Sequence, residues 1–208
     1  MKALIITYNR LELPVKMALW LNARNIEPIF IDNNSDYIPL LEYYADRCPY
    51  KVLRMDQNYG HMVVWSQNVL DKLEITGNYI VSDPDLDLSG IPDDFLNILE
   101  GGLIKYPKFD KCGFSLEIND VTNKSIIEFE NNYWIHPLDS MYFNAPIDTT
   151  FALYKSKYYS FNAIRTNRPY TARHIPWYYN DFNNLPDDEV YYFKNTGESS
   201  TIQWRFKE

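Results

Sequence analysis

Glycine, cysteine and histidine are scarce in this 208-residue chain, which has 7, 2 and 3 of them. The glycines form no G-x-S-x-G elbow, no G-x-x-x-x-G-K phosphate loop and no G-x-G-x-x-G fingerprint, which argues against elbow hydrolases, P-loop enzymes and dinucleotide dehydrogenases. Two cysteines, Cys48 and Cys112, are too few for a disulfide framework or a cysteine zinc site. We expect both to be free, buried thiols in a reducing compartment.

Basic residues are also few, with 20 Lys and Arg against 28 Asp and Glu, a net charge of −8. Nucleic acids and anionic membranes attract basic surfaces, so we expect no nucleic-acid partner. No run approaches 18 apolar residues, so we predict no membrane span. The apolar run Ala3–Ile6 is too short for the core of a signal peptide, and a cytoplasmic location is predicted.

Aromatic residues are abundant, at 16% of the chain, with 18 tyrosines among them. Most are expected to pack in the core, although Trp134, Tyr142 and Trp177 are candidates for stacking on sugar rings. Hydrophobic residues make up 46% and charged residues 23%, as in ordinary globular domains.

The first half of the sequence alternates apolar strand patterns with helix patterns. Short continuous apolar runs are typical of strands buried in a parallel sheet. We predict strands at Ala3–Ile6, Pro28–Asp32, Lys51–Met55 and Asn78–Ser82, and helices at Pro14–Asn25, Pro39–Tyr44 and Met62–Leu73. This alternation indicates an α/β protein with a doubly wound, mostly parallel sheet flanked by helices.

The second half is less regular. We predict helices at Pro92–Ile104 and Lys124–Asn132 and strands at Lys111–Ile118 and Thr150–Tyr154, followed by a stretch rich in proline and aromatic residues. Because no repeat, low-complexity tract or linker divides the sequence, we predict a single domain over residues 1–208.

Polar residues follow all four predicted strands of the first half. In open parallel sheets, ligands bind outside the carboxyl ends of the strands. The polar segments at these ends are Thr7-Tyr8-Asn9-Arg10, Asp32-Asn33-Asn34-Ser35, Asn58-Tyr59-Gly60-His61 and Asp83-Pro84-Asp85-Leu86-Asp87. We expect them to share one rim of the sheet.

The segment Asp83–Asp87 holds three carboxylates in five residues, which repel one another unless a cation or several donors lie among them. Oxygen ligands of this kind suit Mg²⁺ or Mn²⁺ held together with substrate phosphates. A calcium loop is an alternative, but Leu88 stands where such a loop needs glycine. A solvated turn in which Asp87 or Ser89 caps the next helix is another.

Residues 149–180 contain no acidic residue but several basic ones, among them Arg173 and His174. In an acidic protein, such a segment is suited to lie over an anionic ligand such as a diphosphate. The alternative is an ordinary basic surface balanced by acids elsewhere.

Four motifs in order resemble the nucleotide-binding half of GT-A glycosyltransferases of the family-2 type. They are Leu4-Ile5-Ile6-Thr7-Tyr8-Asn9-Arg10, Ile31-Asp32-Asn33-Asn34-Ser35, Asn58-Tyr59-Gly60 and Asp83-Pro84-Asp85. The resemblance covers roughly residues 3–90, and segments around Asp148 and His174 are similar to bacterial and viral members. It implies a nucleotide-binding half over about residues 1–90 and an acceptor-side half over about residues 91–208.

The resemblance further implies a UDP-sugar donor, a divalent cation (Mn²⁺ or Mg²⁺) and a glycan or glycoprotein acceptor. Asp85, Asp83 and His174 would hold the cation. The nucleotide and its diphosphate would lie near Thr7, Tyr8, Arg10, Asn58, Asp83, Arg173 and His174, with Asp32 accepting from the uracil N–H.

A catalytic base is less clear from the resemblance, because the Glu-Asp pair of inverting members has no close match here. Asp148, which precedes a predicted strand, is the first candidate, and Asp188 in Asp187-Asp188-Glu189 is the second. Two other functions stay open at this stage: a catalytically silent carbohydrate-binding or assembly domain, and a sugar nucleotidyltransferase. The latter lacks its glycine-rich loop, because Asn9-Arg10-Leu11-Glu12 follows the first strand.

Overall fold

The computed structural model describes residues 1–196. Its strands are β1 (Lys2–Thr7), β2 (Glu27–Asp32), β3 (Lys51–Arg54), β4 (Tyr79–Ser82), β5 (Leu86–Asp87), β6 (Lys111–Leu116), β7 (Tyr142–Asn144), β8 (Ala152–Tyr154) and β9 (Ala163–His174). The α-helices are α1 (Glu12–Asn22), α2 (Ile38–Asp46), α3 (Val63–Ser66), α4 (Val69–Lys72), α5 (Phe95–Lys105), α6 (Lys124–Asn131) and α7 (Asp187–Asn195). Short 3₁₀ turns occupy Gly60–Met62, Ile175–Tyr178 and Phe182–Asn184.

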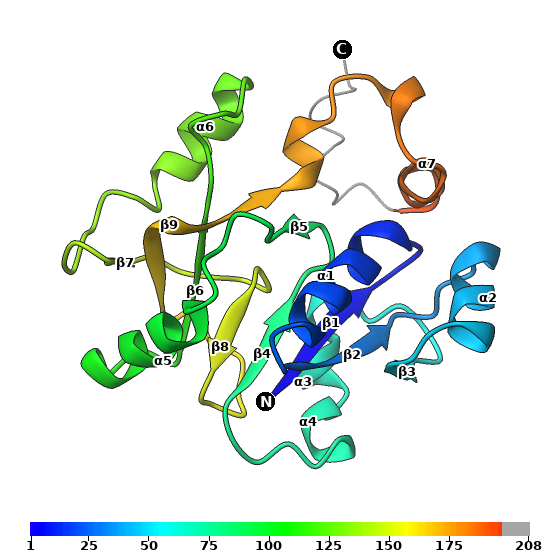
Figure 1. Ribbon diagram of the computed structural model, residues 1–208, viewed down its shortest axis with the longest axis horizontal. Coiled ribbons are helices and arrows are strands. Elements are labelled where there is room, and N and C mark those ends of the chain that lie inside the picture. Colours follow the sequence, from blue (N-terminus) through cyan, green and yellow to red (C-terminus); the bar gives the residue numbers. More distant parts are fainter. Residues whose placement is uncertain (197–208) are drawn as a thin grey trace.

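The strands form one sheet in the order β3-β2-β1-β4-β8-β6-β9-β5, with β7 paired to β9 (Figure 1). The first four strands are mutually parallel. Strand β8 runs against both β4 and β6, and β9 is again parallel to β6. Six strands therefore share one direction, and the predicted α/β class with a mostly parallel sheet is confirmed.

The core lies on both faces of the sheet because residues of β1 alternate between the two. Ala3 and Ile5 belong to a hydrophobic cluster with residues of α1 and α5. Leu4 and Ile6 belong to another, with residues of α3 and α4. This two-sided burial explains why the strand reads as a continuous apolar run.

Some predicted elements differ from those observed. The helix predicted over residues 62–73 is divided into α3 and α4, because Asn68 between them has a left-handed backbone (φ 51°). Strand β8 begins two residues later than predicted and is antiparallel to its neighbours. The stretch rich in proline and aromatics contains β9, a strand of 12 residues.

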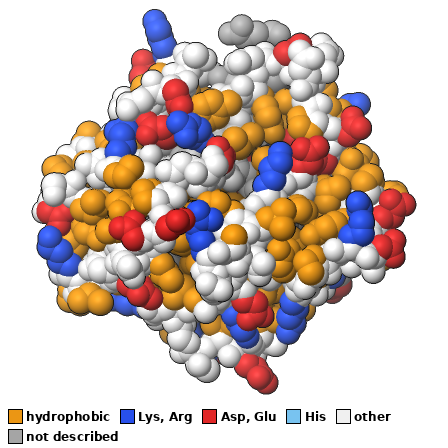
Figure 2. All heavy atoms as spheres, viewed as in Figure 1, with side chains coloured by type: hydrophobic (Ala, Val, Ile, Leu, Met, Phe, Trp, Pro, Cys, Tyr) orange, Lys and Arg blue, Asp and Glu red, His pale blue; other side chains and the backbone are white. Residues whose placement is uncertain are grey.

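The remaining general expectations concern thiols, membranes and surface charge. Both cysteines are free, but only Cys112 is buried, whereas Cys48 is half-buried. Among residues 1–196, no helix combines the length and the apolar character needed to cross a membrane. Lys and Arg side chains are interspersed with Asp and Glu across the face shown in Figure 2.

Candidate active site

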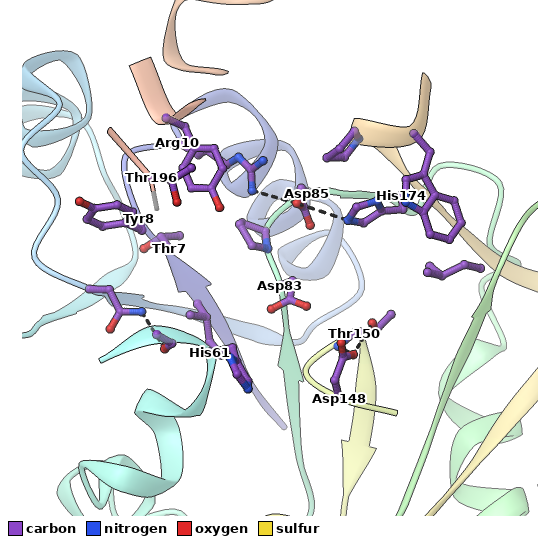
Figure 3. A pocket seen from close by; sticks show the side chains of 18 of the residues that line it. Thr7, Tyr8, Arg10, His61, Asp83, Asp85, Asp148, Thr150, His174 and Thr196 are labelled. Carbon is purple, nitrogen blue, oxygen red and sulfur yellow. Dashed lines mark hydrogen bonds and ion pairs between the residues drawn. The ribbon is translucent and has the colours of Figure 1, made fainter. Parts of the chain in front are cut away.

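A cavity of about 460 Å³ lies at the carboxyl ends of β1 and β4 and beside the start of β8. Residues from both halves of the chain line it. From the first half these are Ile6, Thr7, Tyr8, Arg10, Asn33, Asn58, Gly60, His61, Asp83, Pro84 and Asp85. The second half contributes Leu116, Phe129, Glu130, Tyr133, Asp148, Thr150, Arg165, His174, Pro176, Trp177, Tyr192, Phe193 and Thr196. Figure 3 shows the labelled side chains around this cavity.

The turn after β1 brings Tyr8 and Arg10 to the cavity. Asn9 between them adopts the left-handed conformation (φ 53°), which asparagine tolerates better than most residues. Its side-chain oxygen accepts hydrogen bonds from the backbone N–H groups of Asp36 and Tyr37 at 2.8 and 3.0 Å. The loops after β1 and β2 are thereby joined into one rim.

Asp85 lies at the centre of a buried charge cluster. Its Oδ2 accepts from Arg10 Nη1 at 2.8 Å and lies 3.5 Å from His174 Nε2. Burial alone would raise the pKa of Asp85, but His174 and the Arg10 guanidinium hold that pKa well below its usual range. Asp85 is therefore ionised at neutral pH, and its contact with His174 connects the turn after β4 to the end of β9.

Arg10 also binds the C-terminal helix α7. Its Nη2 donates to Glu189 Oε2 at 3.2 Å, and its guanidinium carbon lies 3.7 Å from the centre of the Tyr192 ring. Burial raises the pKa of Glu189 to about 7, although the charge of Arg10 acts in the opposite direction. Arg10 thus connects two carboxylates that lie far from it and from each other in the sequence, at separations of 75 and 179 positions from Arg10.

Asp83 occupies the position between Asp85 and Asp148 (Figure 3). Its Oδ1 accepts from Thr149 Oγ1 at 2.7 Å, and its backbone N–H donates to the Thr149 carbonyl. Burial, together with the charges of Asp148 and Asp85, raises the pKa of Asp83 well above its ordinary value. A carboxyl group in this position binds a proton or a cation readily.

Asp148 is held from two sides at the entrance to β8. Its Oδ1 accepts from the N–H and the hydroxyl of Thr150 at 3.0 and 2.7 Å. Its carbonyl oxygen accepts from the buried Lys111 Nζ at 2.9 Å. Burial alone would raise the pKa of Asp148, but the Thr150 hydrogen bonds and the charge of Arg165 lower it. The result is a fixed, ionised carboxylate exposed toward the cavity.

The donor set suits a hard divalent cation. Asp85 Oδ1 is buried and has no hydrogen-bond partner among the described residues, and the same holds for His174 Nδ1. Asp83 lies beside Asp85 and has a pKa that an added positive charge would bring down. No group of three or more His, Cys, Asp or Glu in residues 1–196 has metal-binding geometry. Asp85 and Asp83 could supply one or two carboxylates to such a cation, whose remaining ligands would be substrate oxygens.

The cavity brings together most of the residues singled out in the sequence. These are Thr7, Tyr8, Arg10, Asn58, Asp83, Asp85, Asp148 and His174. Arg173 is not among the lining residues, since its side chain pairs with Asp120 at 2.9 Å. Its neighbour His174 points to the cavity instead, because side chains alternate along strand β9.

Asp32 is fully buried and does not line the cavity. Its carboxylate accepts from the hydroxyl and the N–H of Ser35, and Arg54 Nε lies 3.4 Å away. Burial raises the pKa of Asp32 in spite of these partners. The neighbouring Asn33 lines the cavity, so Asp32 supports the rim from behind in this structure.

Asp188 is buried beneath the start of α1 and does not line the cavity. Its Oδ2 accepts from the backbone N–H groups of Leu11 and Glu12 at 2.7 and 2.8 Å. A carboxylate here satisfies two of the unpaired donors at a helix N-terminus. Of the two candidate bases, only Asp148 faces the space where a substrate would bind.

Two lining residues, Glu130 and Tyr192, were not anticipated from the sequence. Glu130 forms a buried ion pair of 2.7 Å with Arg165, which belongs to the basic segment over residues 149–180. Tyr192 packs on Arg10 from α7, and Glu189 of the same helix pairs with Arg10 without lining the cavity. A lone acidic or basic residue in a helix or strand carries no signal for such pairing, because the partners are far apart in sequence. Of the three aromatic candidates, Trp177 lines the cavity, whereas Trp134 and Tyr142 do not.

Comparisons with known proteins give structural similarities only. No protein-family model matches the chain, and no curated protein matches it. Among solved structures, S. aureus TarS 1-349 is 16% identical with a TM-score of 0.43, over 74% of this chain and 46% of that one. The same fragment in complex with UDP-GlcNAc is 18% identical with a TM-score of 0.38, over 59% of this chain and 36% of that one. HddC from Yersinia pseudotuberculosis is 13% identical with a TM-score of 0.47, over 77% of this chain and 83% of that one.

The chain thus spans less than half the length of the TarS fragment. All of these identities are under 25% and all of the TM-scores under 0.5. The fold class accordingly rests on the strand order and pairing observed in this chain, and the function on its own cavity.

Proposed function

We propose that this protein is a metal-dependent glycosyltransferase that moves a sugar from a UDP-sugar to a hydroxyl group of a glycan or glycoprotein. One observation carries the proposal. Asp83, Asp85 and Asp148 face one cavity from the ends of β4 and the entrance to β8, and one buried oxygen of Asp85 lacks a partner. Such an arrangement suits a cation with a diphosphate on one side and a proton acceptor on the other.

On the donor side, Asp85 and Asp83 are the proposed ligands of Mn²⁺ or Mg²⁺, with His174 beside them. When bound, the cation takes up the negative charge that develops on the leaving diphosphate. Thr7, Tyr8 and Asn58 line the part of the cavity proposed for the nucleoside. Arg10 is already in place near Asp85 and adds a fixed positive charge on the same side.

On the acceptor side, Asp148 is the proposed base. Its carboxylate would take the proton of the acceptor hydroxyl as the oxygen attacks the anomeric carbon and the bond to the diphosphate breaks. The two hydrogen bonds from Thr150 and the Lys111 bond to the carbonyl fix its position. Such fixation matters because proton transfer needs a heavy-atom approach of about 2.6–3.2 Å.

The test is calorimetric titration of the protein with UDP, GDP, ADP and CMP, with and without Mn²⁺, followed by hydrolysis assays with several UDP-sugars. We expect UDP to bind most tightly and to need Mn²⁺. Asp85→Ala is expected to abolish the Mn²⁺ dependence. Asp87→Ala is the matched control, since Asp87 caps the turn at Ser89 and does not line the cavity.

Equal UDP affinity in Asp85→Ala and in the parent, with and without Mn²⁺, would contradict the metal assignment. Sugar binding without any nucleotide binding would instead favour a catalytically silent carbohydrate-binding or assembly domain. Release of pyrophosphate from UTP and a sugar phosphate would favour a sugar nucleotidyltransferase. A cytoplasmic location stays a prediction. From the similarity of the segments around Asp148 and His174 to viral members, we also propose an origin as the glycosyltransferase domain of a chlorella-virus protein.

A further inference from the structure

Arg165 has a place in the cavity that structural pairing alone does not explain. It lies in β9, is 4% exposed and lines the cavity. Its Nε donates to the Pro146 carbonyl at 2.8 Å, and its Nη1 donates to Glu130 Oε1 at 2.7 Å. Its other terminal nitrogen, Nη2, makes no hydrogen bond to residues 1–196 and is not sealed from solvent.

The guanidinium is held rigidly in this position. The Tyr133 ring covers it, with 4.1 Å between the guanidinium carbon and the ring centre. With one face covered and two nitrogens bonded, the orientation of the remaining N–H groups is fixed. A guanidinium fixed in this way is suited to donate to an oxygen atom of a ligand, because little conformational entropy is left to lose.

The neighbours of Arg165 fit a sugar. Asp148 lies close enough for the charge of Arg165 to lower its pKa. The ring of Tyr133, which covers the guanidinium, lines the same cavity and is of the kind on which sugar rings pack. A donor, an aromatic ring and a proposed base therefore line one cavity.

We propose that Arg165 is an acceptor-binding residue, whose Nη2 donates to an oxygen of the acceptor sugar while Asp148 faces the attacking hydroxyl. This inference rests on the proposed function and assigns its acceptor subsite. Glu130 is a positioning residue in this arrangement, since it holds the guanidinium and is almost completely buried.

The experiment measures binding of methyl glycosides to the protein by saturation-transfer NMR and titration, in the presence of UDP and Mn²⁺. The panel contains neutral hexosides and a glucuronide, so that a hydroxyl oxygen and a carboxylate are distinguished as the group that Arg165 contacts. Arg165→Lys keeps the charge but loses the planar fork, and we expect the dissociation constant of the best glycoside to rise about tenfold or more. UDP affinity and hydrolysis of UDP-sugars should stay within about twofold of the parent.

A control variant separates binding from folding. Arg168→Lys alters an arginine of the same strand that also has a carboxylate partner, Glu117, and an aromatic cover, Trp134, but does not line the cavity. We expect it to bind the glycoside within about threefold of the parent, and circular dichroism with thermal unfolding verifies that each variant is folded.

A folded Arg165→Lys that binds the glycoside as the parent does would overturn the inference. So would a parent that binds UDP but none of the glycosides up to their solubility limit, which would leave the donor site intact. A parent that binds no nucleotide contradicts the proposed function instead. In that case glycoside binding is measured without nucleotide. Weaker binding in Arg165→Lys than in the parent would then support the role of Arg165, and equal binding would overturn it.

Discussion

The guanidinium of Arg10 donates to the carboxylate of Asp85 across 2.8 Å, joining the turn after β1 to the turn after β4. Both side chains are nearly inaccessible, with 6% and 10% of their surfaces exposed. The pair is also part of the contact with α7, because Arg10 Nε lies 2.9 Å from Glu189 Oε1. The side chain of Arg10 consequently links the charge of Asp85 in the cavity to the position of α7.

Removing Arg10 should destabilise the fold strongly. Arg10→Met leaves Asp85 and Glu189 buried without their common partner, and loss of one member of a buried ion pair typically costs about 3–5 kcal/mol. Urea unfolding followed by tryptophan fluorescence measures the effect. Lys16→Met, which removes a solvent-exposed ion pair with Glu12, is the control and should change little. Similar stability in the two variants would mean that Arg10 is dispensable for the fold.

Asp148 and Asp188 should respond differently to the same substitution. Asp148→Asn is expected to keep UDP binding and stability and to lower the transfer rate by about 10²–10⁴, the usual value of a general base. Asp188→Asn weakens the bonds to the start of α1 and should cost about 0.5–2 kcal/mol of stability. Steady-state kinetics and thermal unfolding of both variants measure this. An inactive Asp188→Asn beside an active Asp148→Asn would reverse the assignment of the base.

Asp32 should affect nucleotide binding. Its bonds to Ser35 and Arg54 hold the loop that places Asn33 at the cavity. We therefore expect Asp32→Ala to weaken the binding of UDP by about 1–3 kcal/mol, the scale of a lost charged hydrogen bond. If Asp32 itself selects uracil, the loss should be larger for UDP than for GDP or CMP. Calorimetric titration of the three nucleotides decides between these outcomes, and unchanged UDP affinity would rule out both.

Stability should fall as the pH rises from about 5 to about 8. Burial raises the pKa values of Glu130 and Glu189 to about 7, from an ordinary 4.5. Arg165, His174, Asp148 and Tyr133 face Glu130, and Arg10, Asp85, Asp188 and Tyr179 face Glu189. The native state thus holds these two protons more tightly than the unfolded chain does.

The stability that these protons contribute is complete below the unfolded pKa and is lost as the pH rises through about 7. The free energy of unfolding, measured by urea titration at several pH values, should therefore decline over this interval. Glu130→Gln and Glu189→Gln should each reduce the slope. A stability that is constant between pH 5 and pH 8 would contradict the raised pKa values of these two carboxyl groups.

The first half of the fold follows from the sequence because its signals are local. Strands β1, β2 and β4 end at Thr7, Asp32 and Ser82, where the continuous apolar runs give way to polar residues. Parallel strands share a rim, and most of the residues that follow these ends do line one cavity. Asp32 does not line it, since its side chain is bonded to Ser35 within the loop.

The second half depends on pairings that a local pattern does not contain. Strand β8 lies between β4 and β6 and runs against both, so the residues before it, Asp148 and Thr150, reach the rim. The bond between Arg165 and Glu130 joins residues 35 positions apart, and that between Leu11 and Asp188 joins residues 177 positions apart. These contacts appear only once the sheet order is known.

The hydrogen bonds from Leu11 and Glu12 to Asp188 have a consequence for hydrogen exchange. Because both amide protons point at a carboxylate of α7, they are shielded only while that helix is docked. Their exchange rates in native protein would then report the opening of α7, although the two amides lie near the start of the chain. Slower exchange at these two amides on addition of a nucleotide would show that nucleotide binding makes the opening of α7 rarer.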